Sequence, residues 1–124
     1  MREPLRDKGR LEHILYAIDR VEEFTRGRTK EQLVSDPLHL HATVYNIQVI
    51  GEAIYKLTPE FKQAHPQTPW ALIEKMRHIL VHDYYRINND ILWLVITEDI
   101  PPLKVQIESY ILEMVTNEDA QGNI

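Results

Sequence analysis

The sequence predicts an all-α fold, an antiparallel bundle of four to five helices. Apolar residues recur three or four positions apart along most of the chain, and no stretch alternates apolar and polar residues as a half-buried strand would. Glycine is scarce, with 4 in 124 residues, and the breaks between the periodic stretches are short. Amphipathic helices joined by short loops are typical of a helical bundle.

The first helix is expected around six apolar residues that form one stripe: Leu11, Ile14, Leu15, Ile18, Val21 and Phe24. Gly27 ends it, and Thr29-Lys30-Glu31-Gln32 has the pattern of a capping box that opens a short helix. Asp36-Pro37 combines an N-cap with proline at the first helical position and opens a second long helix to about Leu57. Thr58-Pro59 repeats this signature.

The C-terminal half contains three more boundaries. Thr68-Pro69-Trp70 opens the next main helix, and Asn88-Asn89-Asp90 caps a short apolar one. Asp99-Ile100-Pro101-Pro102 is expected to break the chain again before a last amphipathic helix over 103–114. Residues 117–124 are expected to form a polar tail of this single domain, which spans 1–124.

Composition narrows the class of protein. The chain lacks a run of about 18 apolar residues and an N-terminal apolar stretch, so we expect no membrane span and no signal peptide. It contains no cysteine, which excludes thiolate chemistry and fits the cytoplasm. The net charge of −5 argues against a broad basic surface, so any nucleic acid would be bound in a local pocket.

One stretch, from Arg77 to Arg86, departs from the ordinary helical pattern. It places two His, two Arg, an Asp and two Tyr around the apolar centre Ile79-Leu80-Val81. Because this centre would be anchored in the core, the polar side chains cannot all lie in bulk water, and a half-buried Arg or His needs a partner or a function.

The spacing of the stretch favours a composite site. Arg77 and His82 are five residues apart, about 140° around a regular helix, whereas Arg77 and Tyr84 share one face. Arg77 and His82 converge only if the helix ends or distorts near His82, or if a second copy of the segment supplies the other half, as in a symmetric dimer.

Arginine and histidine together suit metal-free cleavage of RNA. A guanidinium binds a phosphate through two hydrogen bonds, and an imidazole can take a proton from a 2′-hydroxyl or give one to the leaving oxygen. The pattern alone also fits a purely structural pair of side chains near a helix C-terminus.

A zinc site is a weaker alternative. Glu74, His78 and His82 are spaced i, i+4 and i+8, but Arg77 disfavours a cation there and no fourth ligand is evident. We therefore expect no metal and no other cofactor. The remaining histidines, at positions 13, 39, 41 and 65, are expected in surface or loop roles.

The Arg77 stretch resembles the HepT-like family of the HEPN superfamily, whose hallmark is Arg, four residues, His, one residue and Tyr. Here these are Arg77, His82 and Tyr84. The resemblance covers nearly the whole chain and includes five flanking segments: Arg10 to Ile18, Ile50 to Ala53, Pro69-Trp70, Trp93 and Asp99 to Pro101.

The resemblance implies a HEPN-like homodimer that acts as the ribonuclease toxin of a type VII-like toxin–antitoxin system. Arg77 would bind the scissile phosphate of the RNA and His82 would be the acid–base residue. The partner would be an MntA-type minimal nucleotidyltransferase, an antitoxin that neutralises the toxin by adenylylating Tyr84. Nucleotide added there would block the site by bulk and negative charge.

Two supporting residues and one alternative function complete the expectations. His78 stands where many relatives have Asn, which keeps the position polar, and Glu52 is a candidate partner for Arg77 from the neighbouring helix. The alternative is a non-catalytic helical subunit that binds nucleotide or substrate for a minimal nucleotidyltransferase.

Overall fold

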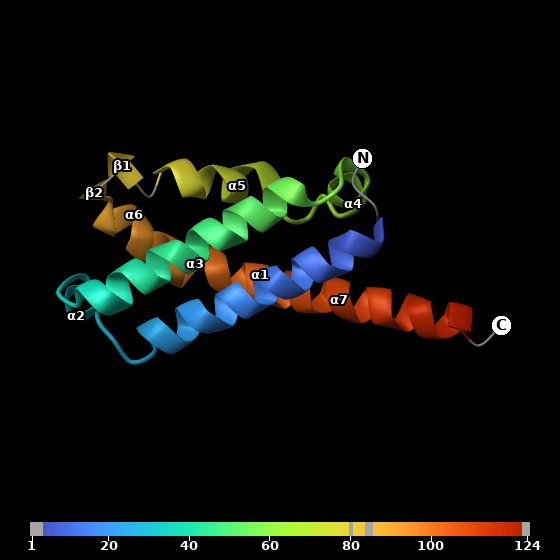
Figure 1. The fold of residues 1–124 in the computed structure, drawn as a ribbon, viewed down its shortest axis with the longest axis horizontal. Coiled ribbons are helices and arrows are strands. Elements are labelled where there is room, and N and C mark those ends of the chain that lie inside the picture. Colours follow the sequence, from blue (N-terminus) through green and yellow to red (C-terminus); the bar gives the residue numbers. More distant parts are fainter. Residues whose placement is uncertain (1–3, 80, 84–85, 123–124) are drawn as a thin grey trace.

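The computed structural model describes the backbone of residues 4–79, 81–83 and 86–122 and the side chains of residues 6–75 and 86–117. Its longer helices are α1 (Pro4–Thr25), α3 (Pro37–Lys56), α5 (Trp70–Ile79) and α7 (Ile100–Gly122). Helix α1 packs against α3 and α7, and α3 also packs against α5 (Figure 1). The all-α prediction is confirmed for most of the described chain. No described helix is long and apolar enough to cross a membrane.

The short helices begin where the sequence predicts. They are α2 (Lys30–Val34), α4 (Pro59–Ala64) and α6 (Asn89–Leu94). Each predicted N-cap side chain accepts a hydrogen bond from the backbone N–H three residues later: Thr29 for α2, Asp36 for α3, Thr58 for α4 and Asn88 for α6. Because a cap satisfies a backbone donor that the helix leaves free, these polar residues set the helix boundaries.

The core lies between α1, α3, α5 and α7, and it contains the stripe predicted for the first helix. Leu11, Ile14 and Ile18 of α1 are fully buried, as are Ile54 of α3 and Ile107 of α7. These side chains come from three different helices, so the contact between α1, α3 and α7 is fully buried in the described core.

Two short strands correct the expectation that the chain contains none. β1 (Val81–Asp83) and β2 (Arg86–Ile87) pair antiparallel, with Val81 opposite Ile87 and Asp83 opposite Arg86. The strands are three and two residues long. An alternating pattern does not become visible over so few residues, so the periodicity of the sequence could not reveal them.

The predicted break at Asp99-Ile100-Pro101-Pro102 is also wrong. A π-helical segment, η1 (Val95–Asp99), connects α6 directly to α7, and the Ile100 N–H donates to the Val95 carbonyl five residues earlier. Pro101 and Pro102 are the second and third residues of α7, so the helical chain continues through both prolines. Helix α7 continues to Gly122, into the stretch expected to be a polar tail.

Candidate active site

The helical part of the motif ends between its arginine and its histidine. Arg77 and His78 belong to α5, which ends at Ile79, and His82 is the central residue of β1. The sequence allows Arg77 and His82 to converge if the helix ends near His82 or if a second copy of the segment supplies one of them. The backbone shows the first arrangement, because α5 ends before His82. The side chains of residues 76–85, and all of Tyr84, lie outside the described residues.

This helix end invalidates two arguments from helical spacing. The expectation that Arg77 and Tyr84 share one helix face is wrong, because α5 stops at Ile79. The i, i+4, i+8 zinc arrangement fails for the same reason, since Glu74 is in α5 and His82 is in β1. The Glu74 carboxylate instead lies 4.0 Å from the Lys62 ammonium group. Among the described residues, no group of three potential metal ligands occurs.

The strand pair joins α5 to α6 at the end of the bundle that lies away from both chain termini (Figure 1). On its α6 side, Ile87 packs against the core and the Asn88 side chain accepts from the Ile91 N–H at 3.1 Å. Arg86 of β2 is exposed. The backbone that carries His82 is therefore paired with a strand that the core and a helix cap hold in place.

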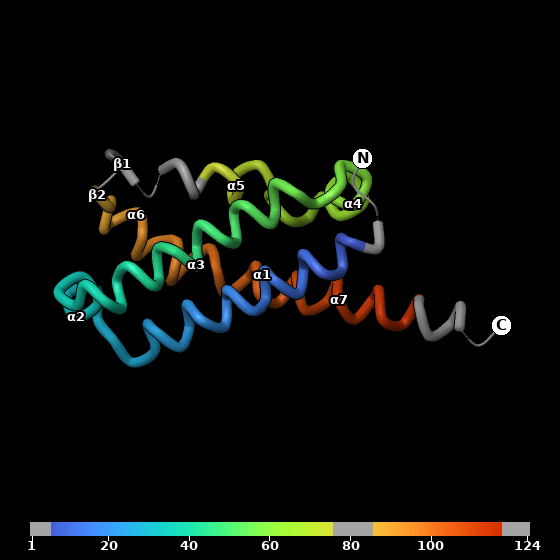
Figure 2. The backbone as a smooth tube through the Cα atoms, in the orientation of Figure 1, coloured from blue at the N-terminus to red at the C-terminus, as the bar shows by residue number. Residues whose placement is uncertain are grey.

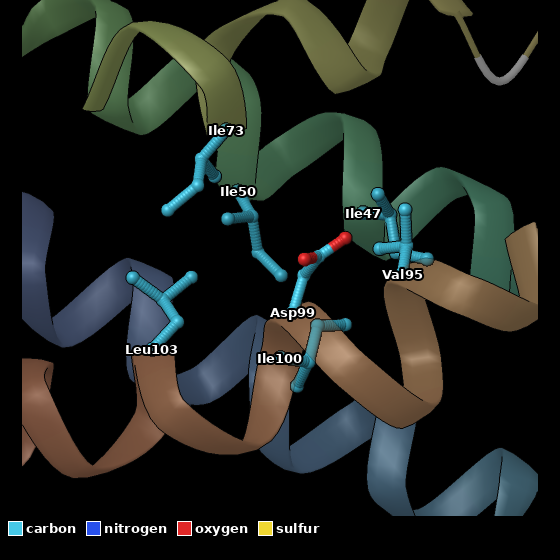
Figure 3. A pocket seen from close by; sticks show the side chains of 7 residues that line it. All are labelled: Ile47, Ile50, Ile73, Val95, Asp99, Ile100 and Leu103. Carbon is cyan, nitrogen blue, oxygen red and sulfur yellow. The ribbon is translucent and has the colours of Figure 1, made fainter. Parts of the chain in front are cut away.

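Asp99 is a carboxylate beneath α5 that sequence reasoning used only as a helix breaker and as part of the family resemblance. It lines a small cavity of about 10 Å³ with six apolar residues: Ile47, Ile50, Ile73, Val95, Ile100 and Leu103 (Figure 3). It also lines a neighbouring groove of about 80 Å³ with Pro69, Leu72, Pro102 and Gln106. Burial raises the pKa of Asp99, and the nearby charge of Glu98 raises it further. In the sequence, Asp99 could have been recognised as an inward-facing carboxylate because it is an acidic residue on the inward face of an apolar helix.

Glu52 is exposed on α3, where it lines a different groove of about 340 Å³ between α1 and α3. The polar residues that share this groove are Arg10, His13 and Lys56. The described groove neighbours of Glu52 therefore belong to α1 and α3, and its pairing with Arg77 stays a prediction.

The other histidines have diverse surroundings. His13 and His41 are exposed, as expected, and His39 Nδ1 lies 2.8 Å from an Asp36 carboxylate oxygen. His65 lies in the loop that follows α4, as expected, and its ring packs inward: it stacks on Phe61 at 4.2 Å between ring centres and lies 4.4 Å from the Tyr110 ring. This ring is part of an aromatic cluster at the α4–α5–α7 junction.

Comparison with known proteins decides the family. The family model described as Ribonuclease HepT-like matches residues 14–110, which include α5, the strand pair and the start of α7. The chain belongs to this family. The HepT-like resemblance of the Arg77, His82 and Tyr84 motif is thereby confirmed, and so is endoribonuclease activity as the activity of the family.

Several proteins that are similar to this chain have names that describe them as ribonucleases. The "Putative RNase TTE0752" of Caldanaerobacter subterraneus is 38% identical over 79% of this chain and 88% of its own length. The "Probable ribonuclease HepT" of Thermococcus cleftensis is 38% identical over 82% of this chain and 92% of its own. The chain also spans 51% of the "Gamma-glutamylcyclotransferase and putative RNase MJ0434" of Methanocaldococcus jannaschii, at 32% identity. No solved structure matches the chain.

Proposed function

We propose that this HepT-like protein is a metal-independent endoribonuclease in which Arg77 and His82 carry the reaction. The observation that supports this most strongly is the family match across residues 14–110, which includes the complete Arg77, His82 and Tyr84 motif. The backbone of the motif adds support, because α5 ends between Arg77 and His82 and so removes the helical geometry that would separate them.

The two side chains supply what cleavage of an RNA phosphodiester needs. His82 takes the proton from a ribose 2′-hydroxyl, whose oxygen attacks the adjacent phosphorus while the bond to the 5′-oxygen breaks. The guanidinium of Arg77 binds the phosphate oxygens and stabilises the charge that develops on them. A protonated histidine then returns a proton to the leaving 5′-oxygen.

His78 and Glu52 have supporting roles in this proposal. His78 follows Arg77 on α5 and keeps a polar group beside the phosphate-binding residue. Glu52 would orient the Arg77 guanidinium from α3. We further propose that the protein acts in the cytoplasm as a homodimer, in which two copies of the motif meet and form one RNA site.

The biological role that follows is that of a toxin of a type VII-like toxin–antitoxin system. The partner would be a cognate MntA-type minimal nucleotidyltransferase that transfers an adenylyl group to the Tyr84 hydroxyl. An added phosphodiester brings a negative charge and the bulk of a nucleotide next to the phosphate-binding residue, so RNA would be excluded.

Growth of cells that express the protein tests this role. We expect the natural chain to inhibit growth and His82→Ala to be harmless, whereas His41→Ala, which removes an exposed histidine from α3, should remain toxic. Co-expression with a cognate MntA-type nucleotidyltransferase should restore growth and add one adenylyl group to Tyr84 in peptide mass spectra. Persistent toxicity of His82→Ala would contradict the assignment of the acid–base residue.

The alternative function is a non-catalytic helical subunit that binds nucleotide or substrate for a minimal nucleotidyltransferase. The exposed α1–α3 groove favours this alternative, since the cationic side chains of Arg10 and Lys56 that line it could hold a phosphate. In that case the purified protein would co-purify with the transferase and would cleave no RNA, with or without EDTA.

A further inference from the structure

The groove between α1 and α3 is a second candidate binding site, apart from the Arg77 motif. It has a volume of about 340 Å³, which is enough for a ligand of the size of a nucleotide. Its lining residues are Arg10, His13, Val49, Glu52, Ala53 and Lys56. Two permanent cations therefore line it beside one carboxylate, although the chain as a whole carries a net charge of −5. The groove is a local basic site on an acidic protein.

Arg10 supplies the guanidinium of this groove. Its side chain is half-buried between the helices, and its Nη1 atom has no exposed surface and no hydrogen-bond partner among the described residues. A guanidinium binds phosphate oxygens through two parallel N–H groups, so the part of Arg10 that lines the groove suits a phosphate group. Lys56, exposed on α3, adds a second positive charge to the same groove.

Two exposed tyrosines extend the groove in one direction. Tyr16 follows the lining residue His13 by three positions on α1, which is about one helical turn. Tyr45 precedes the lining residue Val49 by four positions on α3. Because α1 and α3 run antiparallel, as Figure 2 shows, both turns lead the same way along the bundle. The two tyrosines are 62% and 65% exposed, so their rings are accessible to a ligand.

The tyrosine end of the groove lies toward the strand pair. The start of α1 and the end of α3 lie at one end of the bundle, and β1 and β2 lie at the other (Figure 1). From Arg10 to Tyr16 the chain advances six residues, about 9 Å along the helix axis, in the direction of the strands. A ligand that lies along the groove therefore extends from its cationic end toward the end of the bundle where β1 carries His82.

We propose that this groove is an RNA-binding exosite: Arg10 and Lys56 bind a backbone phosphate of a single-stranded RNA, and Tyr16 and Tyr45 stack against its bases. Cations that hold the backbone and exposed aromatic rings that stack bases are the two groups that bind single strands. A free nucleotide would need only the cationic end, whereas the tyrosines one turn further along favour a strand. The exosite's effect on cleavage rests on the proposed function, but its binding of RNA does not.

The Arg20 side chain supports the stacking role of Tyr16. The guanidinium carbon of Arg20 lies 4.9 Å from the centre of the Tyr16 ring, a cation–π contact that steadies an otherwise exposed ring. Arg20 itself lies 3.0 Å from the Glu23 carboxylate, so it is held on the surface of α1. The ring is thus restrained before RNA binds, which lowers the entropy lost on stacking.

Binding of a fluorescein-labelled single-stranded RNA, followed by fluorescence anisotropy, tests the exosite. The His82→Ala chain serves as the background, so that the strand is not cleaved by the proposed mechanism. Arg10→Gln removes charge-assisted hydrogen bonds to a phosphate and should raise the Kd about tenfold. Tyr16→Ala should also raise it about tenfold, because one stacking ring is lost, whereas Tyr16→Phe keeps the ring and should bind like the background chain.

The salt dependence of binding distinguishes a phosphate contact from a change in the fold. For single strands, each phosphate contact contributes about 0.7 to the slope of log Kd against log salt concentration. The slope should decrease by about this amount in Arg10→Gln and in Lys56→Gln, which changes an exposed residue. Arg26→Gln is the matched control: it removes an exposed arginine just after α1 and should leave both the Kd and the slope unchanged.

Cleavage assays with His82 intact test the effect on the reaction. Contacts remote from the scissile bond are the same in the substrate complex and in the transition state, so Arg10→Gln and Tyr16→Ala should raise KM and leave kcat close to the natural value.

The outcomes are distinguishable. An unchanged RNA affinity and salt slope in Arg10→Gln and Lys56→Gln would overturn the inference, whether or not the protein cleaves RNA. It would also be overturned if these variants lost affinity for AMP in calorimetry but kept that for RNA, which would make the groove a site for a free nucleotide. Weaker RNA binding by the variants of a chain that cleaves no RNA would retain the exosite and reject the proposed function.

Discussion

Asp7 is the buried carboxylate whose removal should destabilise the fold most. It lies on α1 with 2% of its surface exposed, and its two oxygens accept hydrogen bonds from the Thr58 backbone N–H at 2.9 Å and from the Thr58 hydroxyl at 2.6 Å. The same hydroxyl accepts from the Phe61 N–H at 3.2 Å and so caps α4. One side chain on α1 therefore holds the start of a helix 51 residues away in sequence.

Asp7→Ala should lower the free energy of unfolding by about 3–5 kcal/mol, since a hydrogen bond to a charged group contributes roughly 1.5–3 kcal/mol and Thr58 is left with a buried, unpaired N–H. For a domain of this size, the decrease corresponds to a fall in melting temperature of roughly 10–20 °C. Asp7→Asn should cost much less, because the amide can still accept from the N–H and can donate to the Thr58 hydroxyl.

Chemical denaturation followed by circular dichroism measures this effect, at a fixed protein concentration. Asp19→Ala is the matched control on the same helix, where the carboxylate is 46% exposed and lies 3.4 Å from Lys104. An exposed ion pair contributes little. If Asp7→Ala were no more destabilising than Asp19→Ala, the reasoning from buried hydrogen bonds would be refuted.

Three further effects follow from described side chains. Ile73→Ala should lower the free energy of unfolding by about 2–5 kcal/mol in denaturant titrations and Ile73→Val by about 1 kcal/mol, because Ile73 is 4% exposed in the core. The hydrogen bond from the backbone N–H of His39 lowers the pKa of Asp36. The ionised Asp36 carboxylate therefore stabilises the fold above the ordinary carboxyl pKa, and this contribution is lost as the pH falls through the lowered pKa. Below about pH 4 the natural chain should lose more stability than Asp36→Asn in acid titrations. Tyr110→Phe removes the 2.6 Å hydrogen bond to Thr68 and should cost about 1 kcal/mol by thermal unfolding.

The helix boundaries could be predicted because local chemistry sets them. Thr29, Asp36, Thr58 and Asn88 each cap a helix through their own side chain, and this preference is visible in the residues themselves. The family could be identified for a similar reason, since Arg77, His82 and Tyr84 stand at a fixed spacing.

Features that depend on distant contacts could not be predicted. The strand pair requires Val81 to meet Ile87, and no periodic signal exists over so few residues. The expected break at Asp99–Pro102 is replaced by a π-helical segment, because the Ile100 N–H donates a hydrogen bond to the Val95 carbonyl. The Pro101-Pro102 pair in the sequence indicates a break and gives no sign of this hydrogen bond. The surroundings of Asp99 depend on three helices that converge only in the folded chain.

Cleavage of a labelled single-stranded RNA by the purified protein in the presence of EDTA tests the central claim most directly. We predict that the natural chain cleaves the RNA, that Arg77→Ala and His82→Ala each lose the activity, and that Arg26→Ala and His41→Ala, which remove exposed residues of the same types, retain it. Cleavage that requires a divalent cation, or that survives in His82→Ala, would contradict the account.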